Sequence, residues 1–172
     1  MRLYRGKVPI IAEEVVSNLL EEGFIEVSPE LLGEVNLDVE AVLNEYRRLD
    51  WKVTEKAKDI VAQRGLDYSH TGRVKKQLAS KQGFGVGDKA LDWIITQSIE
   101  VLLHSRNVEE VFAGDNDLRR VLRDTIRKHT EMESDLDRQV RARIKNLQEG
   151  TGNWDLEYQR VMDNVKRGHG LD

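Results

Sequence analysis

The chain has 172 residues, of which 34% are charged and only 6% are aromatic, and its formal net charge is −4. This composition favours helices with one buried face and one solvated face, and it disfavours a β-sandwich or a β-barrel. The lack of cysteine excludes disulfides, thiolate zinc sites and cysteine nucleophiles, and the negative net charge excludes a global basic field for nucleic acid.

The sequence contains no recognisable targeting or membrane segment. The basic N-terminal residues are followed by a helical pattern that carries Glu13 and Glu14, and not by the apolar core of a signal peptide. No uncharged run approaches the roughly 18 residues that a membrane span requires. We therefore expect a cytoplasmic protein without a membrane partner.

The first half of the chain predicts a short helix from Val8, a short extended segment at residues 24–27 and one long helix. A brief helix that begins after Ser28 is expected to end at Gly33. The long helix is predicted over residues 38–64, where apolar side chains recur every three or four positions without an intervening proline or glycine. A further short helix is predicted over residues 73–81.

The second half begins with a glycine-rich connection at residues 83–87, which we interpret as a helix–helix linker with conformational freedom. Asp88 is expected to cap the next helix, and residues 108–112 again have an extended pattern. A second long helix is predicted from Asp117 to Leu147, and Asn153 begins the last one. The glycine run precedes a helix, as phosphate loops do, but no strand comes before it, so no nucleotide site is predicted.

The order of elements in the second half repeats that in the first. We divide the chain into residues 1–82 and 83–172, two helical halves packed as one globular unit, whose long helices would meet about a pseudo-two-fold axis. The predicted fold is mainly α, with two long antiparallel-type helices, shorter packed helices, a weak internal duplication and two very short strands. Amphipathic helices can also match by chance, and the apolar stripes could instead be buried between two chains of a homodimer.

Two groups of basic residues are candidates for contact with a partner. Arg119, Arg123 and Arg127 recur at intervals of four, which places them on one helix face, and Lys75 and Lys76 belong to a second group. Acidic residues between the arginines dilute their field. A solvated, ion-paired face is therefore one alternative, a surface for a protein partner is the second, and contact with nucleic acid is the third.

Two single residues are also candidates. Trp51 lies off the apolar stripe of the first long helix, so it either packs within the chain or serves as an exposed anchor for a partner. His104 lies beside Ser105 at a predicted helix end, where it would interact with the helix dipole or, less simply, join an acid brought close by folding. No histidine pair has the spacing of a metal site, so no catalytic residue, metal or cofactor is assigned.

Motifs along nearly the whole chain resemble a bacterial family catalogued as domain of unknown function number five hundred and seven. The resemblance rests on these segments: residues 1–4, 11–14, 37–43, 83–88, 102–105, 108–112 and 144–150. It implies a compact bacterial protein, and it brings no activity, cofactor or catalytic residue with it.

Three functions are compatible with the sequence. The leading hypothesis is a non-enzymatic helical protein that binds another macromolecule, more readily a protein than a nucleic acid, because no catalytic set converges. The second is a nucleic-acid or ribosome-associated factor that uses the arginine rows. The third is an enzyme with a site near His104.

Overall fold

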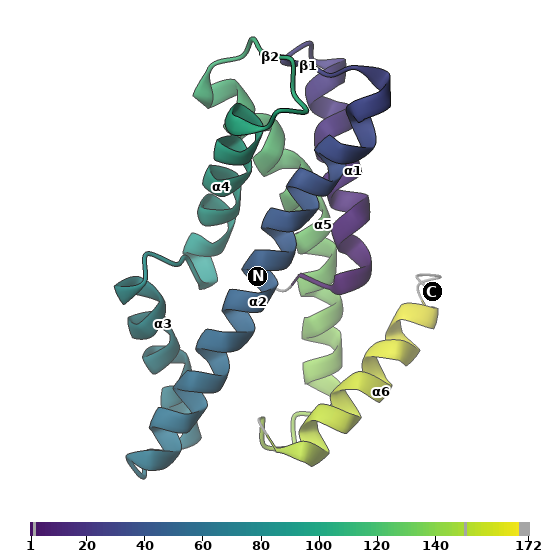
Figure 1. Cartoon of the computed structure of the whole chain (residues 1–172). Helices are drawn as coiled ribbons and strands as arrows, with labels where there is room; N and C mark the ends of the chain where they lie inside the picture. Colours follow the sequence, from purple (N-terminus) through teal and green to yellow (C-terminus); the bar gives the residue numbers. More distant parts are fainter. Residues whose placement is uncertain (2, 150, 169–172) are drawn as a thin grey trace. The chain divides into compact units, whose positions relative to one another are not determined.

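The computed structural model describes residues 1, 3–149 and 151–168, without the side chains of Met132 and Glu133. Arg2 and Gly150, which lie in segments of the family resemblance, and His169, one of the four histidines of the chain, lie outside the described residues. The chain is mainly α-helical, as the sequence predicts. Its helices are α1 (Val8–Glu21), α2 (Leu32–Gln63), α3 (Thr71–Lys81), α4 (Ala90–His104), α5 (Asp115–Arg143) and α6 (Gly152–Gly168) (Figure 1).

The chain forms two compact units that divide within α5. The first unit comprises Met1 and Leu3–His129, and the second comprises the described residues from Thr130 onwards. These units therefore do not coincide with the two predicted halves, which meet at residues 82 and 83. Both halves do contain a helix, a short strand, a long helix and a shorter helix in that order. Their origin by duplication stays a prediction.

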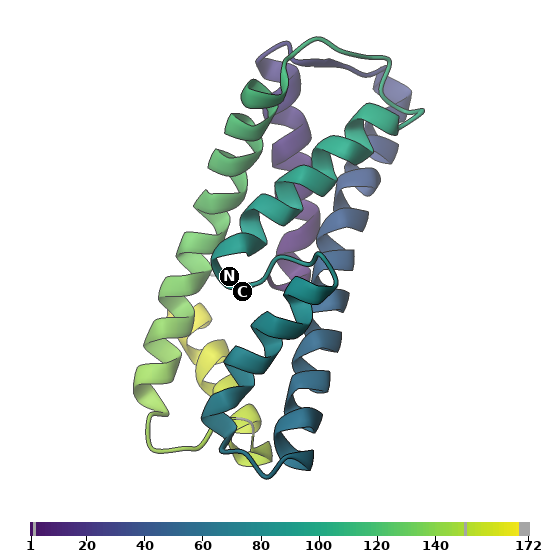
Figure 2. The same ribbon diagram turned by 90° about the vertical axis from the view of Figure 1, so that its left-hand side faces the viewer.

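Helix α2 is the central element of the first unit, because α1, α3 and α4 all pack against it. Figure 2 shows α3 and α4 following one another along its length. The end of the predicted apolar stripe of α2 packs against α3, where Ala57 and Val61 form a small separate cluster with Val74. The earlier part of the stripe, up to Val53, is mostly buried and shares one core with α1, α4 and the first part of α5. The most completely buried large side chains of this core are Ile11, Leu19, Leu43, Ile94, Ile95, Leu102, Leu118, Leu122 and Ile126.

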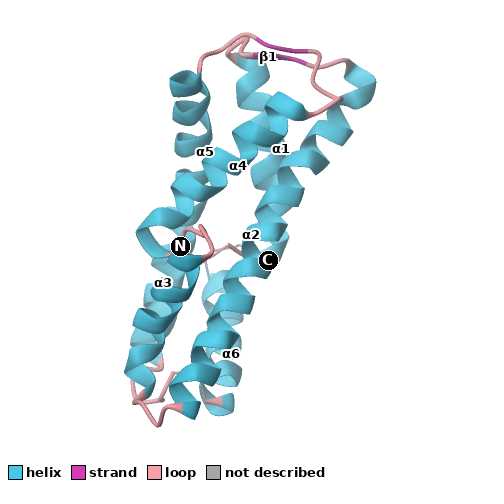
Figure 3. Cartoon of the chain, turned by 60° about the vertical axis from the view of Figure 1, so that its left-hand side comes forward, coloured by secondary structure: helices cyan, strands magenta, loops and turns pink. Residues whose placement is uncertain are grey.

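The two predicted short strands are present as β1 (Ile25–Glu26) and β2 (Glu110–Val111). They pair antiparallel, with Ile25 opposite Val111, and they close one end of the first unit (Figure 3). Two further backbone bonds flank the pair, from Glu109 N–H to the carbonyl of Glu26 and from Phe112 N–H to that of Phe24, each at 2.9 Å. This pairing holds the segment that leads into α2 next to the segment that leads into α5.

The long helix α2 begins six residues earlier than predicted, because Gly33 does not end a helix. A 3₁₀ turn, Pro29–Leu31, leads directly into α2, and Gly33 is the second residue of the helix. Glycine costs about 1 kcal/mol relative to alanine in a helix interior. Burial of Val35 and Val39 in the core outweighs that cost.

The other long helix, α5, begins at Asp115 and ends at Arg143, before the predicted end at Leu147.

The second unit is organised around Arg141. Its guanidinium bonds Asp137 at 2.8 Å and Glu149 at 2.8 and 3.0 Å, and it lies 5.3 Å from the ring centroid of Trp154. The hydrogen bonds with Glu149 are the main reason why the pKa of Arg141 is raised. The ring of Tyr158 stacks on Trp154, and its hydroxyl donates to Asp137. One arginine thus links the end of α5, the following loop and α6.

Candidate binding groove

An aromatic cluster joins three elements of the first unit. Tyr46 comes from α2, Phe84 from the connection between α3 and α4, and Trp93 from the first turn of α4. The ring centroids lie 5.3 Å apart for Tyr46 and Phe84, 5.9 Å for Tyr46 and Trp93, and 5.1 Å for Phe84 and Trp93, which meet edge to face. Burial raises the pKa of Tyr46. Such contacts hold each ring in one orientation.

The glycine-rich segment is a packed loop, so its interpretation as a linker with conformational freedom is wrong. Phe84 and Val86 are only 6% and 8% exposed, because the aromatic cluster and the core hold them. Gly83 and Gly87 adopt φ angles of +64° and +63°, which favour glycine. A Cβ atom on Gly85 would lie 2.3 Å from the carbonyl oxygen of Lys89, so only glycine allows the loop this close to α4.

The beginning of α4 also differs from the prediction. Asp88 lies within a 3₁₀ turn, Gly87–Lys89, and not in the N-cap position of the helix. The helix starts at Ala90, with Lys89 in the N-cap position. Asp88 is exposed instead and takes part in the lining of a groove.

A groove of about 1080 Å³ lies between α3, the glycine loop and α4. Its apolar floor is formed by the buried Phe84 and Val86 and by the half-buried ring of Trp93. The exposed residues of its rim include three lysines: Lys76, Lys81 and Lys89. The rest of the lining is Gln77, Ser80, Gly83, Gly85, Asp88, Asp92, Thr96 and Gln97.

Part of the arginine row of α5 lies beside this groove. Arg119 donates to Thr96 at 3.1 Å and to Asp115 at 2.6 Å, and Arg123 reaches Asp92 at 3.2 Å. Thr96 and Asp92 both belong to the groove lining. Two basic groups that lie some forty residues apart in the sequence thus meet around one cavity.

The balance of charge around the groove is opposite to that of the whole chain. Five basic side chains are present, three lysines on the rim and two arginines next to it, against three acidic ones: Asp88, Asp92 and Asp115. The chain as a whole carries a formal net charge of −4. Coulombic attraction at this surface therefore favours an anionic ligand, and the effect decreases with ionic strength.

The other predicted basic residues have different surroundings. Lys75 forms an ion pair with Asp50 at 2.7 Å, which ties α3 to α2. Lys76, its neighbour in sequence, reaches over the loop instead, and its Cε would lie 3.7 Å from a Cβ atom on Gly87. Arg127 is exposed on α5, one turn beyond Arg123.

The two single candidates are both on the surface. Trp51 is 67% exposed, so its expected packing within the chain is wrong and the alternative of an exposed anchor stands. The side chain of His104 is exposed at the last residue of α4, and its Nδ1–H donates to the carbonyl of Glu100 at 2.8 Å. The ring therefore bonds the last turn of its own helix at the surface and does not lie in a pocket.

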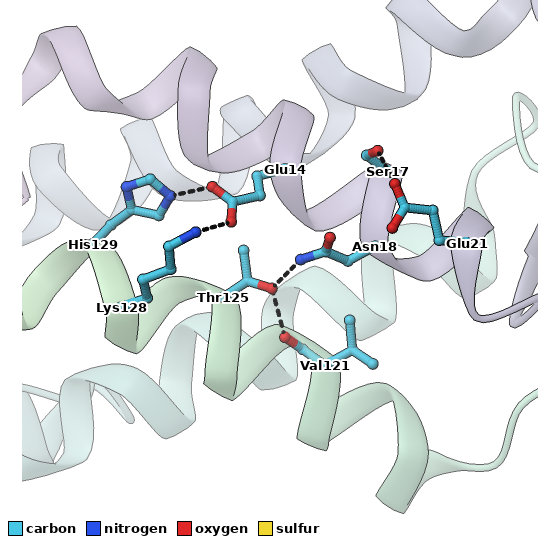
Figure 4. Close-up of polar contacts among 8 residues, drawn as sticks. All are labelled: Glu14, Ser17, Asn18, Glu21, Val121, Thr125, Lys128 and His129. Atoms are coloured by element: carbon cyan, nitrogen blue, oxygen red, sulfur yellow. Dashed lines mark hydrogen bonds and ion pairs between the residues drawn. The ribbon is translucent and has the colours of Figure 1, made fainter.

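A polar clasp between α1 and α5 could not be predicted from the sequence (Figure 4). Glu14 accepts from Lys128 at 2.8 Å and bonds the buried ring of His129 at 2.6 Å, and Asn18 donates to Thr125 at 2.8 Å. The hydrogen bond from Lys128 is the main reason why the pKa of Glu14 is lowered. The partners are more than a hundred residues apart in the chain, so no local spacing reveals them. We define the Glu14–Lys128–His129 set as the clasp.

The described part of the chain contains no group of three histidine, aspartate or glutamate side chains that could hold a metal ion. None of the described helices has an apolar stretch long enough to span a membrane. A protein-family model described as "Protein of unknown function (DUF507)" matches residues 1–171. No curated protein matches the chain.

Proposed function

The chain belongs to the DUF507 family of proteins of unknown function. We propose that it is a non-enzymatic binding protein, and that the groove between α3 and α4 holds an acidic segment of a partner protein. The observation that carries this proposal is the groove itself, with three lysines on its rim and two arginines beside it. A concave surface with an apolar floor and converging polar groups is the usual form of a binding site.

Several contacts favour a protein partner over a nucleic acid. Asp88 and Asp92 line the groove together with its lysines, so a continuous run of negative charge such as a phosphate backbone would be repelled more than carboxylates spaced along a peptide. Separate carboxylates of a protein segment can pair with separate lysines while the chain between them covers the apolar floor.

The position of His104 supports binding in preference to catalysis. Its exposed ring bonds a backbone carbonyl of its own helix, and the nearest carboxylate oxygen, on Glu100, is 3.7 Å away and exposed as well. A general base is normally oriented by a partner within about 3.2 Å and shielded from water. A cytoplasmic location is part of the same proposal, since a chain without cysteine needs no oxidising compartment.

The test is site-specific photo-crosslinking from the groove in cells. A photoreactive amino acid replaces Ser80, an exposed residue of the lining, and mass spectrometry identifies the peptide attached to it. We expect a peptide rich in Asp and Glu. The charge reversal Lys76→Glu with Lys89→Glu should abolish the crosslink.

The matched control is Lys52→Glu with Lys56→Glu, two exposed lysines of α2 that do not line the groove. It changes the net charge by the same amount and should leave the crosslink intact. Equal loss in both variants would show a general charge effect, and a nuclease-sensitive crosslink would show nucleic acid as the partner. Either result would overturn the proposal.

A further inference from the structure

We infer that the segment held in the groove is amphipathic: between its acidic residues it presents one large apolar side chain, which packs on Trp93. This inference rests on the proposed function and specifies the class of segment that the groove accepts. The observations that support it concern the apolar floor of the groove, whereas those that support the proposed function concern the charged residues of its rim.

The floor is an apolar surface that charge alone does not explain. Phe84 and Val86 line the groove as buried residues, and Trp93 lines it as a half-buried one, so part of this aromatic residue remains open to solvent. An all-acidic segment would pair with the lysines and leave this ring in contact with water. An apolar side chain placed on the ring removes both surfaces from water, which is favourable in proportion to the area buried.

The ring of Trp93 is held in position before any ligand arrives. Phe84 meets it edge to face at 5.1 Å, and Tyr46 supports it from α2 at 5.9 Å. Gly85 lies so close that its Cβ, if present, would be 2.8 Å from the Cβ of Trp93. A ring held by two neighbouring rings and by the backbone close to its Cβ loses little conformational entropy on binding, so contact with it adds to affinity.

The lysines of the groove would pair with the acidic residues that flank the apolar side chain of the bound segment. Lys76 extends from α3 over the loop, and Lys89 directly precedes the first residue of α4; both line the groove. The groove volume of about 1080 Å³ slightly exceeds the range of usual ligand sites, roughly 300 to 1,000 Å³. It therefore has room for one large side chain together with the flanking backbone.

The test compares two synthetic peptides by fluorescence anisotropy with the full chain. Both are rich in glutamate and equal in length and charge, but one has a central phenylalanine where the other has serine. We expect both to bind at low ionic strength, with the phenylalanine peptide about tenfold tighter, as burial of one large apolar side chain allows. Addition of salt should weaken both peptides, while the ratio between them stays constant.

Two variants assign the difference to the floor. Trp93→Ala should reduce the tenfold ratio to about one without changing the affinity for the serine peptide. Because this change also removes ring contacts within the unit, Ser80→Phe provides a second variant. It adds an aromatic side chain to the groove lining, should compete with the peptide phenylalanine, and leaves the three rings untouched.

The possible failures are distinguishable. If neither peptide binds in a salt-dependent manner, the proposed function itself is wrong. If both bind equally and Ser80→Phe has no effect, the groove recognises charge alone and this inference is wrong while the proposed function stands. Salt-dependent binding of a single-stranded RNA of equal charge, with tighter affinity than either peptide, would overturn both.

Discussion

Gly85→Ala is the sharpest test of how the groove is built, because a single methyl group meets three atoms at once. Its Cβ would lie 2.3 Å from the carbonyl oxygen of Lys89, 2.9 Å from the carbonyl carbon of that residue and 2.8 Å from the Cβ of Trp93. Two of these atoms are backbone, so the loop itself has to move away from α4.

The expected cost follows from three effects. Overpacking of a rigid site costs about 1 to 3 kcal/mol, and weakening of the Phe84–Trp93 edge-to-face pair adds about 0.5 to 1.5 kcal/mol. The smaller conformational entropy of the unfolded alanine chain returns about 0.4 to 1 kcal/mol. We expect a net destabilisation of about 2 kcal/mol, which lowers Tm by about 5 °C for a chain of this length.

Thermal unfolding followed by circular dichroism measures this shift, and Gly33→Ala is the matched control. Gly33 lies in the first turn of α2 with no atom within 4 Å of an added Cβ and without a positive φ. The same substitution should stabilise there, by about 0.5 kcal/mol. If Gly85→Ala were as stable as the wild type, the loop would not be packed as described, and the reasoning about the floor would fail with it.

Three further results are expected. Glu14→Gln should cost about 1 to 2 kcal/mol by removing a charged acceptor. The pKa of Glu14 is lowered in the folded state, so this stabilisation is fully present above the unfolded-state pKa of 4.5 and is lost as the pH falls through the lower folded-state pKa. Urea unfolding at several pH values would measure this loss. Lys75→Met should lower stability by about 0.5 kcal/mol and leave the binding of acidic peptides unchanged. Lys76→Met should weaken that binding and leave stability unchanged. Arg141→Met should cost the second unit about 1 to 2 kcal/mol, visible as faster amide hydrogen exchange in α6. Unchanged exchange there would contradict the role of Arg141 as the organising residue of that unit.

Much of the fold could be predicted from apolar periodicity and helix signals. The bounds of α1 agree with the position of Pro9 in its first turn, and both short strands were expected at the correct residues. The beginning of α2 could not be predicted, because local signals at Gly33 indicate a break, while burial of Val35 and Val39 decides the outcome. Tertiary packing is stronger than the local cost of one glycine.

The candidate site was predicted only in part. Lys76, Arg119 and Arg123 were identified as basic candidates, but nothing in their spacing shows that they surround one groove. Their meeting depends on the packing of α3 and α4 on α2 and on the contacts of α5 with α4. The floor was not predicted, although the sequence contains one signal for it. Phe84 and Val86 are apolar residues between the glycines of the predicted linker, and a solvent-exposed linker normally lacks such residues.

The clasp also determines how far local unfolding can spread. Helix α5 continues from the first unit into the second without interruption, and the division between the units falls directly after His129. If the second unit melts first, α5 frays from its C-terminal end until it reaches Lys128 and His129, whose bonds to Glu14 hold that turn against α1. The clasp therefore acts as a stop for fraying, and it allows one end of a continuous helix to open while the other end keeps its hydrogen bonds.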